Sequence, residues 1–279
     1  MSGLRRTPTR FEGPLDDSRQ STVDDALARA VVYRALSLAF QTPTAERLRE
    51  SGAHDGFQVL NAALSHLDRL ADPGRSIEPT IARLAAVPGA VPEALEADFV
   101  RLFGHTARGT VCAFETEYGV GQGFHQPQQL ADISGYYLAF GLRPTLASEV
   151  RADHIACECE FMDVLNRKEA WLLANRAPCG DDGETLETTR IAARTFLRDH
   201  LGRFARTVAV RLAAADERGL YGVMGEVLRR FVEMECRRVK VEAGPADLDL
   251  RPEEIDDTPM ACESADQLIQ IQTKPDAAR

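Results

Sequence analysis

The amino-acid sequence predicts an all-α protein: a single helical-bundle domain with disordered ends. Apolar residues recur at helical spacing along most of the chain, and this pattern is typical of helices that bury one face or more. Proline, glycine or polar clusters separate the segments with this spacing. No segment of useful length alternates apolar and polar residues as a strand does. The chain has 279 residues, 44% of them hydrophobic, and can therefore build one large core.

The first helix is predicted to begin at Ser21-Thr22. A hydroxyl cap is followed there by Asp24 and Asp25, and these acids suit the positive end of a helix dipole. Two apolar rows then run along the segment, which indicates a helix buried inside a bundle. Residues 1–20 show no periodicity and are expected to form a flexible arm.

Helical spacing continues towards the C-terminus, with one interruption. The further helices are predicted at residues 44–51, 56–71, 77–86, 92–103, 127–141, 149–175, 185–215 and 219–241. The helix at 185–215 is expected to break near Gly202. The interruption is the glycine-rich stretch 104–126, which has no helical repeat. Long irregular stretches inside a compact domain are often functional.

Charge and composition set the ends of the domain and limit its partners. The net charge is −10, and the stretch from Val241 to Arg279 holds ten acidic and three basic residues. We therefore expect a helical domain over 21–242 and an acidic, disordered tail over 243–279. This charge balance argues against nucleic-acid binding through a basic surface.

The sequence favours a cytoplasmic protein. No apolar run approaches the roughly 18 residues of a membrane span. Arg5-Arg6 is not followed by the apolar segment of an export signal. The cysteines form no CxxC pair and are expected to be reduced thiols. They are Cys112, Cys157, Cys159, Cys179, Cys236 and Cys262.

The stretch DHIACECEF, residues 153–161, suggests a metal site, and its geometry argues against one. A helix turns about 100° per residue, so His154, Cys157 and Glu158 can share a face while Cys159 points away. A strand would place His154 opposite both cysteines. No second Cys/His pair has zinc-like spacing. We therefore expect no bound metal and no other cofactor.

The same stretch fits a buried helix with a polar edge. Ile155, Cys159 and Met162 fall on one apolar stripe, where Cys behaves as a small hydrophobe. His154 and Glu158 lie four residues apart on a second face. Such a pair can simply tether neighbouring helices.

Two functional hypotheses stay open from the residues alone. One is a helical enzyme that uses His154 with Glu158 or Glu115 as an acid–base pair. The other is a thiol sensor or metal carrier that uses the cysteines nearest this stretch, Cys112, Cys157 and Cys159. The chain contains no GxSxG, HExxH, ExxH or GxxxxGK[ST] motif.

Four motifs in order resemble the TorD/DmsD-like family of redox-enzyme maturation chaperones, which includes the NarJ-type proteins. They are FVRLF at 99–103, FETEY at 114–118, ISGYYLAFGL at 133–142, and Asp153-His154 followed by ECEFM at 158–162. The similarity covers about residues 95–175. The chain departs from the pattern at Ala113 and Ala152, where proline is frequent, and at Cys159, where leucine is usual.

The resemblance implies a chaperone and not an enzyme. Such proteins bind the twin-arginine signal peptide and the apo form of a molybdoenzyme subunit of the dimethyl-sulfoxide-reductase type in the cytoplasm. They hold it until the molybdenum cofactor is inserted, before export, and act as monomers or homodimers. The ETEYG loop is most similar to chaperones of enzymes that handle small molecules such as sulfides, hydrocarbons or oxyanions.

The resemblance also implies a set of partner-binding residues. A signal peptide with an arginine pair and an apolar segment needs carboxylate acceptors and apolar walls. Because Asp153 and His154 lie where a loop enters a helix, we expect at least part of each side chain to reach the surface. The candidates are Asp153, His154, Glu158, Phe114, Glu115, Glu117, Tyr118 and Tyr137.

Overall fold

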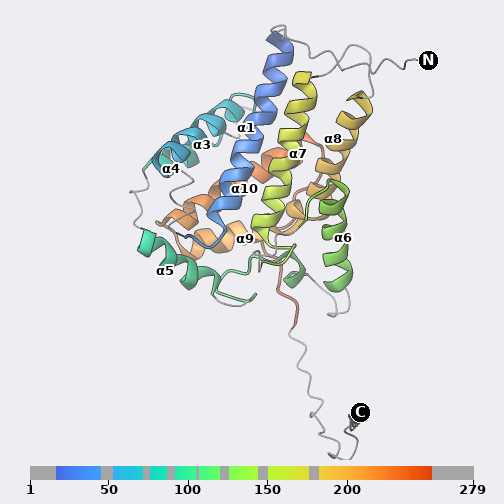
Figure 1. The fold of residues 1–279 in the computed structure, drawn as a ribbon. Helices are drawn as coiled ribbons and strands as arrows, with labels where there is room; N and C mark the ends of the chain where they lie inside the picture. Colours follow the sequence, from blue (N-terminus) through green and yellow to red (C-terminus); the bar gives the residue numbers. More distant parts are fainter. Residues whose placement is uncertain are drawn as a thin grey trace, which may run out of the picture.

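The predicted all-α class is confirmed by a computed structural model of the chain (Figure 1). The structure describes residues 17–44, 53–71, 76–86, 92–104, 107–119, 126–143, 150–175 and 182–252. Within these ranges the regular elements are helices, and the only strand-like pairing is two isolated β-bridges. In the same ranges, none of the helices combines the length and apolar character needed to span a membrane.

The helices follow the predicted order. They are α1 (Asp17–Ala39), α3 (Ala53–Asp68), α4 (Glu78–Ala85), α5 (Pro92–Phe103), the 3-10 turn η2 (Glu115–Glu117), α6 (Gln126–Ala139), α7 (Ile155–Asn175), α8 (Asp182–Asp199), α9 (Leu201–Ala215) and α10 (Leu220–Arg238). The helix predicted at 44–51 falls almost entirely outside the described residues.

Several helix boundaries differ from prediction by a few residues, and three of them have clear local reasons. Helix α1 already begins at Asp17, and the hydroxyl of Thr22 donates to the Arg19 carbonyl inside the helix and does not cap its start. Helix α7 begins at Ile155, not at 149, because the residues just before it pair with another loop. The break between α8 and α9 falls at His200, whose φ of −128° and ψ of −99° end the helical path.

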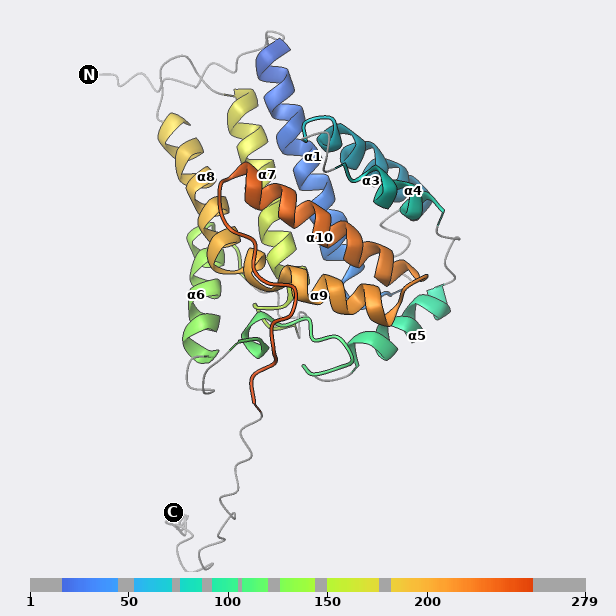
Figure 2. The ribbon, with the colours of Figure 1, turned by 180° about the vertical axis from the view of Figure 1, so that it is seen from behind.

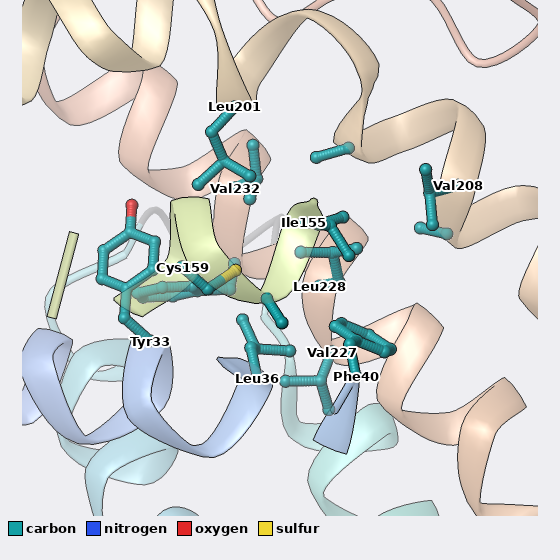
Figure 3. Close-up of a cluster of buried hydrophobic side chains, with 14 of the residues drawn as sticks. Tyr33, Leu36, Phe40, Ile155, Cys159, Leu201, Val208, Val227, Leu228 and Val232 are labelled. Atoms are coloured by element: carbon teal, nitrogen blue, oxygen red, sulfur yellow. The ribbon is translucent and has the colours of Figure 1, made fainter. Parts of the chain in front are cut away.

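The core lies where α1, α7, α9 and α10 meet (Figure 3). Ile155, Cys159 and Met162 are fully buried there, so the predicted apolar stripe of α7 is confirmed. Figure 3 shows Cys159 among apolar side chains of the neighbouring helices. These include Tyr33, Leu36, Phe40, Leu201, Val208, Val227, Leu228 and Val232. This packing fixes the first turn of α7 and, with it, the loop that meets that turn.

The chain after α10 turns back and crosses the body. Lys240 has φ of 57°, and the Lys240 and Val241 amides donate to the carbonyls of Arg237 and Cys236. These two bonds form a Schellman cap, which ends the helix and reverses the chain. Figure 2 shows the following segment running beside α9 towards η2. We call residues 244–252 the C-terminal strap.

The strap corrects the prediction of a disordered tail from residue 243. Residues 243–252 are ordered against the body, and residues 253–279 lie outside the described part of the chain. Leu248 and Leu250 pack on the core, whereas Asp247 and Asp249, which alternate with them along the chain, are exposed. This alternation is that of an extended strand with one buried face.

Candidate functional site

The structure brings the FETEY motif and the Asp153-His154 pair together, as the resemblance implied. We call residues 112–119 the FETEY loop. Phe114 and His154 form an antiparallel β-bridge, and the Glu115 amide donates to the Asp153 carbonyl at 2.9 Å. The loop then makes the η2 turn beside the first turn of α7. Backbone pairing therefore joins two motifs that are far apart in the sequence.

Asp153 is completely buried, so the expectation that its side chain reaches the surface is wrong. One carboxylate oxygen accepts from the amide of Thr116 at 3.1 Å and from its hydroxyl at 2.8 Å. Arg151 donates to both oxygens, at 3.1 and 2.8 Å. A carboxylate loses its hydrogen bonds to water when it is buried, and these donors from within the chain replace them. Asp153 thus holds the η2 turn in shape.

Arg151 is the link between the two motifs, and sequence reasoning missed it. Its guanidinium donates to Glu117 at 2.9 Å and to the Thr116 hydroxyl at 2.7 Å, and it lies 4.8 Å from the centre of the Phe114 ring. Glu117 also accepts from Arg108 at 3.1 Å. Two arginines of the chain itself therefore already occupy the Glu117 carboxylate. The available signal was an arginine two residues before Asp153.

His154 is also buried, and only 7% of its surface is exposed. Its Nδ1 atom accepts from the Ala156 amide at 3.1 Å, and its ring packs edge-on against Phe114 at 4.9 Å. Burial lowers the pKa of His154 to about 4, so the ring is neutral at neutral pH. His154 behaves as an uncharged aromatic cap on the start of α7.

Glu158 lies one turn further along α7 and is completely buried. Neither of its carboxylate oxygens has a hydrogen-bond partner among the described residues. Burial raises the pKa of Glu158, and the charges of Glu115 and Asp153 raise it further. Burial therefore favours the protonated, neutral form of Glu158, and a protonated carboxyl is a weaker acceptor for an arginine than a carboxylate.

Glu115 joins the loop to the junction of α8 and α9. Its carboxylate lies 3.1 Å from Nδ1 of His200 and 3.3 Å from Nη1 of Arg203. The other ring nitrogen of His200 lies 3.3 Å from the Asp132 carboxylate on α6, without hydrogen-bond geometry. His200 was not among the predicted residues. Only the fold places it here, because it lies 85 positions from Glu115 in the sequence.

The aromatic candidates divide between the core and the rim. The Tyr118 hydroxyl donates to the Cys112 carbonyl at 2.6 Å, and the Tyr137 hydroxyl donates to the Ala152 carbonyl at 2.8 Å. Both rings are buried, so neither faces solvent in this structure, and their role in partner binding stays a prediction. Phe114 is half-buried, with Arg151 over its ring.

The cysteines of this region have thiols whose pKa is raised by burial. Burial raises the pKa of the Cys112 thiol to about 11 and that of Cys157 to about 12, so both are protonated at neutral pH. Within the described ranges, no group of three or more His, Cys, Asp or Glu side chains converges in a way that could hold a metal ion. Cys179 and Cys262 lie outside these ranges.

The eight predicted residues thus form one connected cluster, but most of it faces inward. Solvent reaches Phe114 of this cluster and two arginines paired with it, Arg151 and Arg203. The Asp132 carboxylate lies nearby on α6. Asp132 is 65% exposed and Arg203 is 45% exposed. The arrangement can hold the FETEY loop in one conformation and place both acidic and basic side chains around it. It does not place an acid–base pair in contact with solvent.

Comparison with known proteins identifies the family. Residues 60–209 match the family described as nitrate reductase delta subunit. This chain belongs to that family. A similar protein is the dimethyl sulfide dehydrogenase assembly chaperone protein of Rhodovulum sulfidophilum, 29% identical over 239 residues. The match spans 80% of this chain and 88% of that protein. The resemblance to TorD/DmsD-like chaperones is therefore confirmed, and the family match contains the whole FETEY loop and α7.

Proposed function

We propose that this delta-subunit family member is a non-catalytic, cytoplasmic assembly chaperone. Its client is the apo catalytic subunit of a molybdoenzyme of the dimethyl-sulfoxide-reductase type. It binds the client's twin-arginine signal peptide and holds the apo subunit until the molybdenum cofactor is inserted, before export. The observation that carries this proposal is the family match over residues 60–209, together with the name of the Rhodovulum relative.

The client engages the region of the FETEY loop. The residues from the resemblance, Asp153 and Glu115 among them, serve this role by fixing the loop from inside, since their carboxylates are already paired within the chain. The client touches the outer side, where Phe114, Arg151 and Arg203 are accessible. A preformed loop keeps the entropy cost of binding low.

Neither alternative from the sequence gains support from the geometry. For an acid–base enzyme, His154 and Glu158 would have to meet a substrate, yet both are buried and His154 Nδ1 is bound to a backbone amide. A thiol sensor would need a low pKa and access to solvent, and burial raises the pKa of Cys112 and Cys157.

Co-expression with an untagged molybdoenzyme catalytic subunit of the dimethyl-sulfoxide-reductase type tests the proposal. The apo subunit should co-purify with the tagged chain and release when the cofactor is loaded. A subunit lacking its signal peptide should bind less. Light scattering of the free chain and of the complex gives the stoichiometry and separates a monomer from a homodimer. A chain that never retains the apo subunit contradicts the proposal.

A further inference from the structure

The C-terminal strap pairs with the outer edge of the FETEY loop. The Gly119 amide donates to the Asp249 carbonyl at 2.9 Å, and the Arg251 amide donates to the Glu117 carbonyl at 2.8 Å. Tyr118 and Leu250, between these bonds, form an antiparallel β-bridge. The strap therefore sits on the loop as an added strand, which is a common way for a protein to bind an extended peptide.

The strap carries a buried arginine, Arg251, just before its last residue. Arg251 is only 5% exposed, although arginine is seldom fully buried. Its Nε donates to the Thr116 carbonyl at 2.8 Å, and its Nη2 donates to the side-chain oxygen of Gln129 at 2.9 Å. The FETEY loop and α6 thus form a receptor for one guanidinium group, built from a backbone carbonyl and an amide oxygen.

Most of the other hydrogen bonds between the body and the strap are made to the backbone of the strap. Arg206, Thr207 and Arg211 of α9 donate to the carbonyls of Gly244, Pro245 and Leu248 at 2.9, 3.0 and 2.8 Å. Such bonds hold any extended chain, whatever its side chains. The sequence-dependent contacts are the partly buried Leu248 and Leu250 and the guanidinium of Arg251.

One further position fixes where the strap begins. The Gly244 amide donates to the Gly202 carbonyl at 2.8 Å, and a Cβ atom on Gly244 would lie 2.0 Å from the Arg203 carbonyl oxygen. That distance is far below van der Waals contact, so alanine at this position has to lift the strap from α9.

We propose that the strap is an internal occupant of the client-peptide site. An extended client segment displaces it, pairs with the edge from Glu117 to Gly119, and places an arginine where Arg251 lies. The strap combines an arginine with neighbouring apolar side chains, the two features that a twin-arginine signal peptide offers. This inference rests on the proposed function, which supplies the client. The strap then lowers the apparent affinity, since only the fraction of molecules with the strap released can bind.

The first test uses calorimetric titration of the full-length chain. The probe is a synthetic peptide with two consecutive arginines followed by an apolar stretch, and the control peptide has glutamines in place of the arginines. Arg251→Ala removes the anchor and Gly244→Ala lifts the strap, so each should bind the probe with a roughly tenfold lower Kd than the wild type. Asp247→Asn, which changes an exposed side chain of the same strap, should leave the Kd unchanged.

The second test uses hydrogen exchange on the unmodified chain and needs no variant to fold. Adding the probe should speed exchange of the strap amides of Gly244, Leu248 and Arg251. The Gly119 amide should stay protected, because the peptide replaces the Asp249 carbonyl as its acceptor. The nonapeptide GPADLDLRP, which is the strap sequence, should compete with the probe for Arg251→Ala.

The outcomes separate this inference from the proposed function. Equal Kd values for all forms, with the strap still protected when the probe is bound, overturn the inference and leave signal-peptide binding standing. A probe that binds no form overturns signal-peptide binding and the inference with it. Tighter binding by both released variants, with loss of strap protection in the wild type, supports both.

Discussion

Two acidic side chains near the start of α7 differ in their surroundings, although both are completely buried. Asp153 has donors on both carboxylate oxygens, whereas Glu158 has no partner on either oxygen among the described residues. Sequence alone cannot tell them apart, since each is simply an acid near a helix start. The difference arises from Arg151 and Thr116, which reach Asp153 and not Glu158.

The buried Glu158 predicts a pH-dependent stability. Its pKa in the folded chain is raised above the ordinary value of 4.5, so the folded state binds this proton more tightly than the unfolded state. The free energy of unfolding contributed by Glu158 therefore falls as pH rises from about 4.5 through its raised folded-state pKa. Glu158→Gln does not titrate, so its stability relative to the wild type should increase across that window. Denaturant unfolding at several pH values measures this, and parallel curves contradict it.

Removing the Asp153 carboxylate should lower the stability of the protein, because this group holds the FETEY loop in place. Asp153→Ala leaves the Thr116 amide and hydroxyl without their buried acceptor and should cost about 2–3 kcal/mol of unfolding free energy. Asp153→Asn keeps an acceptor for Thr116 and should cost less. Denaturant unfolding of both variants gives the comparison. Unchanged stability of Asp153→Ala with weakened client binding would instead indicate direct contact with the client.

The helices could be predicted from the sequence, whereas the C-terminal strap could not. The helices carry long apolar repeats, and all of those within the described residues lie close to their predicted positions. The strap was missed because its alternation spans only the few residues from Asp247 to Arg251 and lies in an acidic, proline-bearing stretch. The strap is ordered by contacts with residues far away in the sequence. These are the close approach of Gly244 to the Arg203 carbonyl and the hydrogen bond from Arg251 to the Thr116 carbonyl.

The same limit applies to the candidate site. The resemblance correctly grouped the FETEY loop with Asp153-His154, because the motifs themselves carry that information. It did not indicate that these side chains face inward. Their partners Arg151 and His200 belong to no motif, and burial depends on how α6, α8 and α9 close over the loop.

The turn that starts the strap holds a residue in an unfavourable conformation. Lys240 has φ of 57°, in the left-handed region that favours glycine. Lys240→Gly should therefore stabilise the chain by up to about 1 kcal/mol while keeping the Schellman cap. Thermal unfolding checks this, with Lys240→Ala as the control that keeps a Cβ atom. A lower melting temperature for the glycine variant would contradict it.

At the scale of the whole molecule, truncation tests how much the C-terminal strap stabilises the body. Ending the chain after Pro252 keeps the strap and should leave the unfolding free energy unchanged. Ending it after Ala243 removes the strap and should cost about 1–3 kcal/mol, since its hydrogen bonds and apolar contacts exceed the entropy of ordering it only slightly. Denaturant unfolding of the two truncated chains tests this. Equal stability would contradict the packing of the strap.

We expect a molybdoenzyme client to engage the FETEY loop through its signal peptide. Hydrogen exchange of the full-length chain, with and without the apo client subunit, tests it most directly. The account predicts slower exchange in the FETEY loop and in the first turn of α7 on binding. It also predicts that this protection disappears when the client lacks its signal peptide. Protection confined to other helices, or protection of the loop that persists without the signal peptide, would contradict the account.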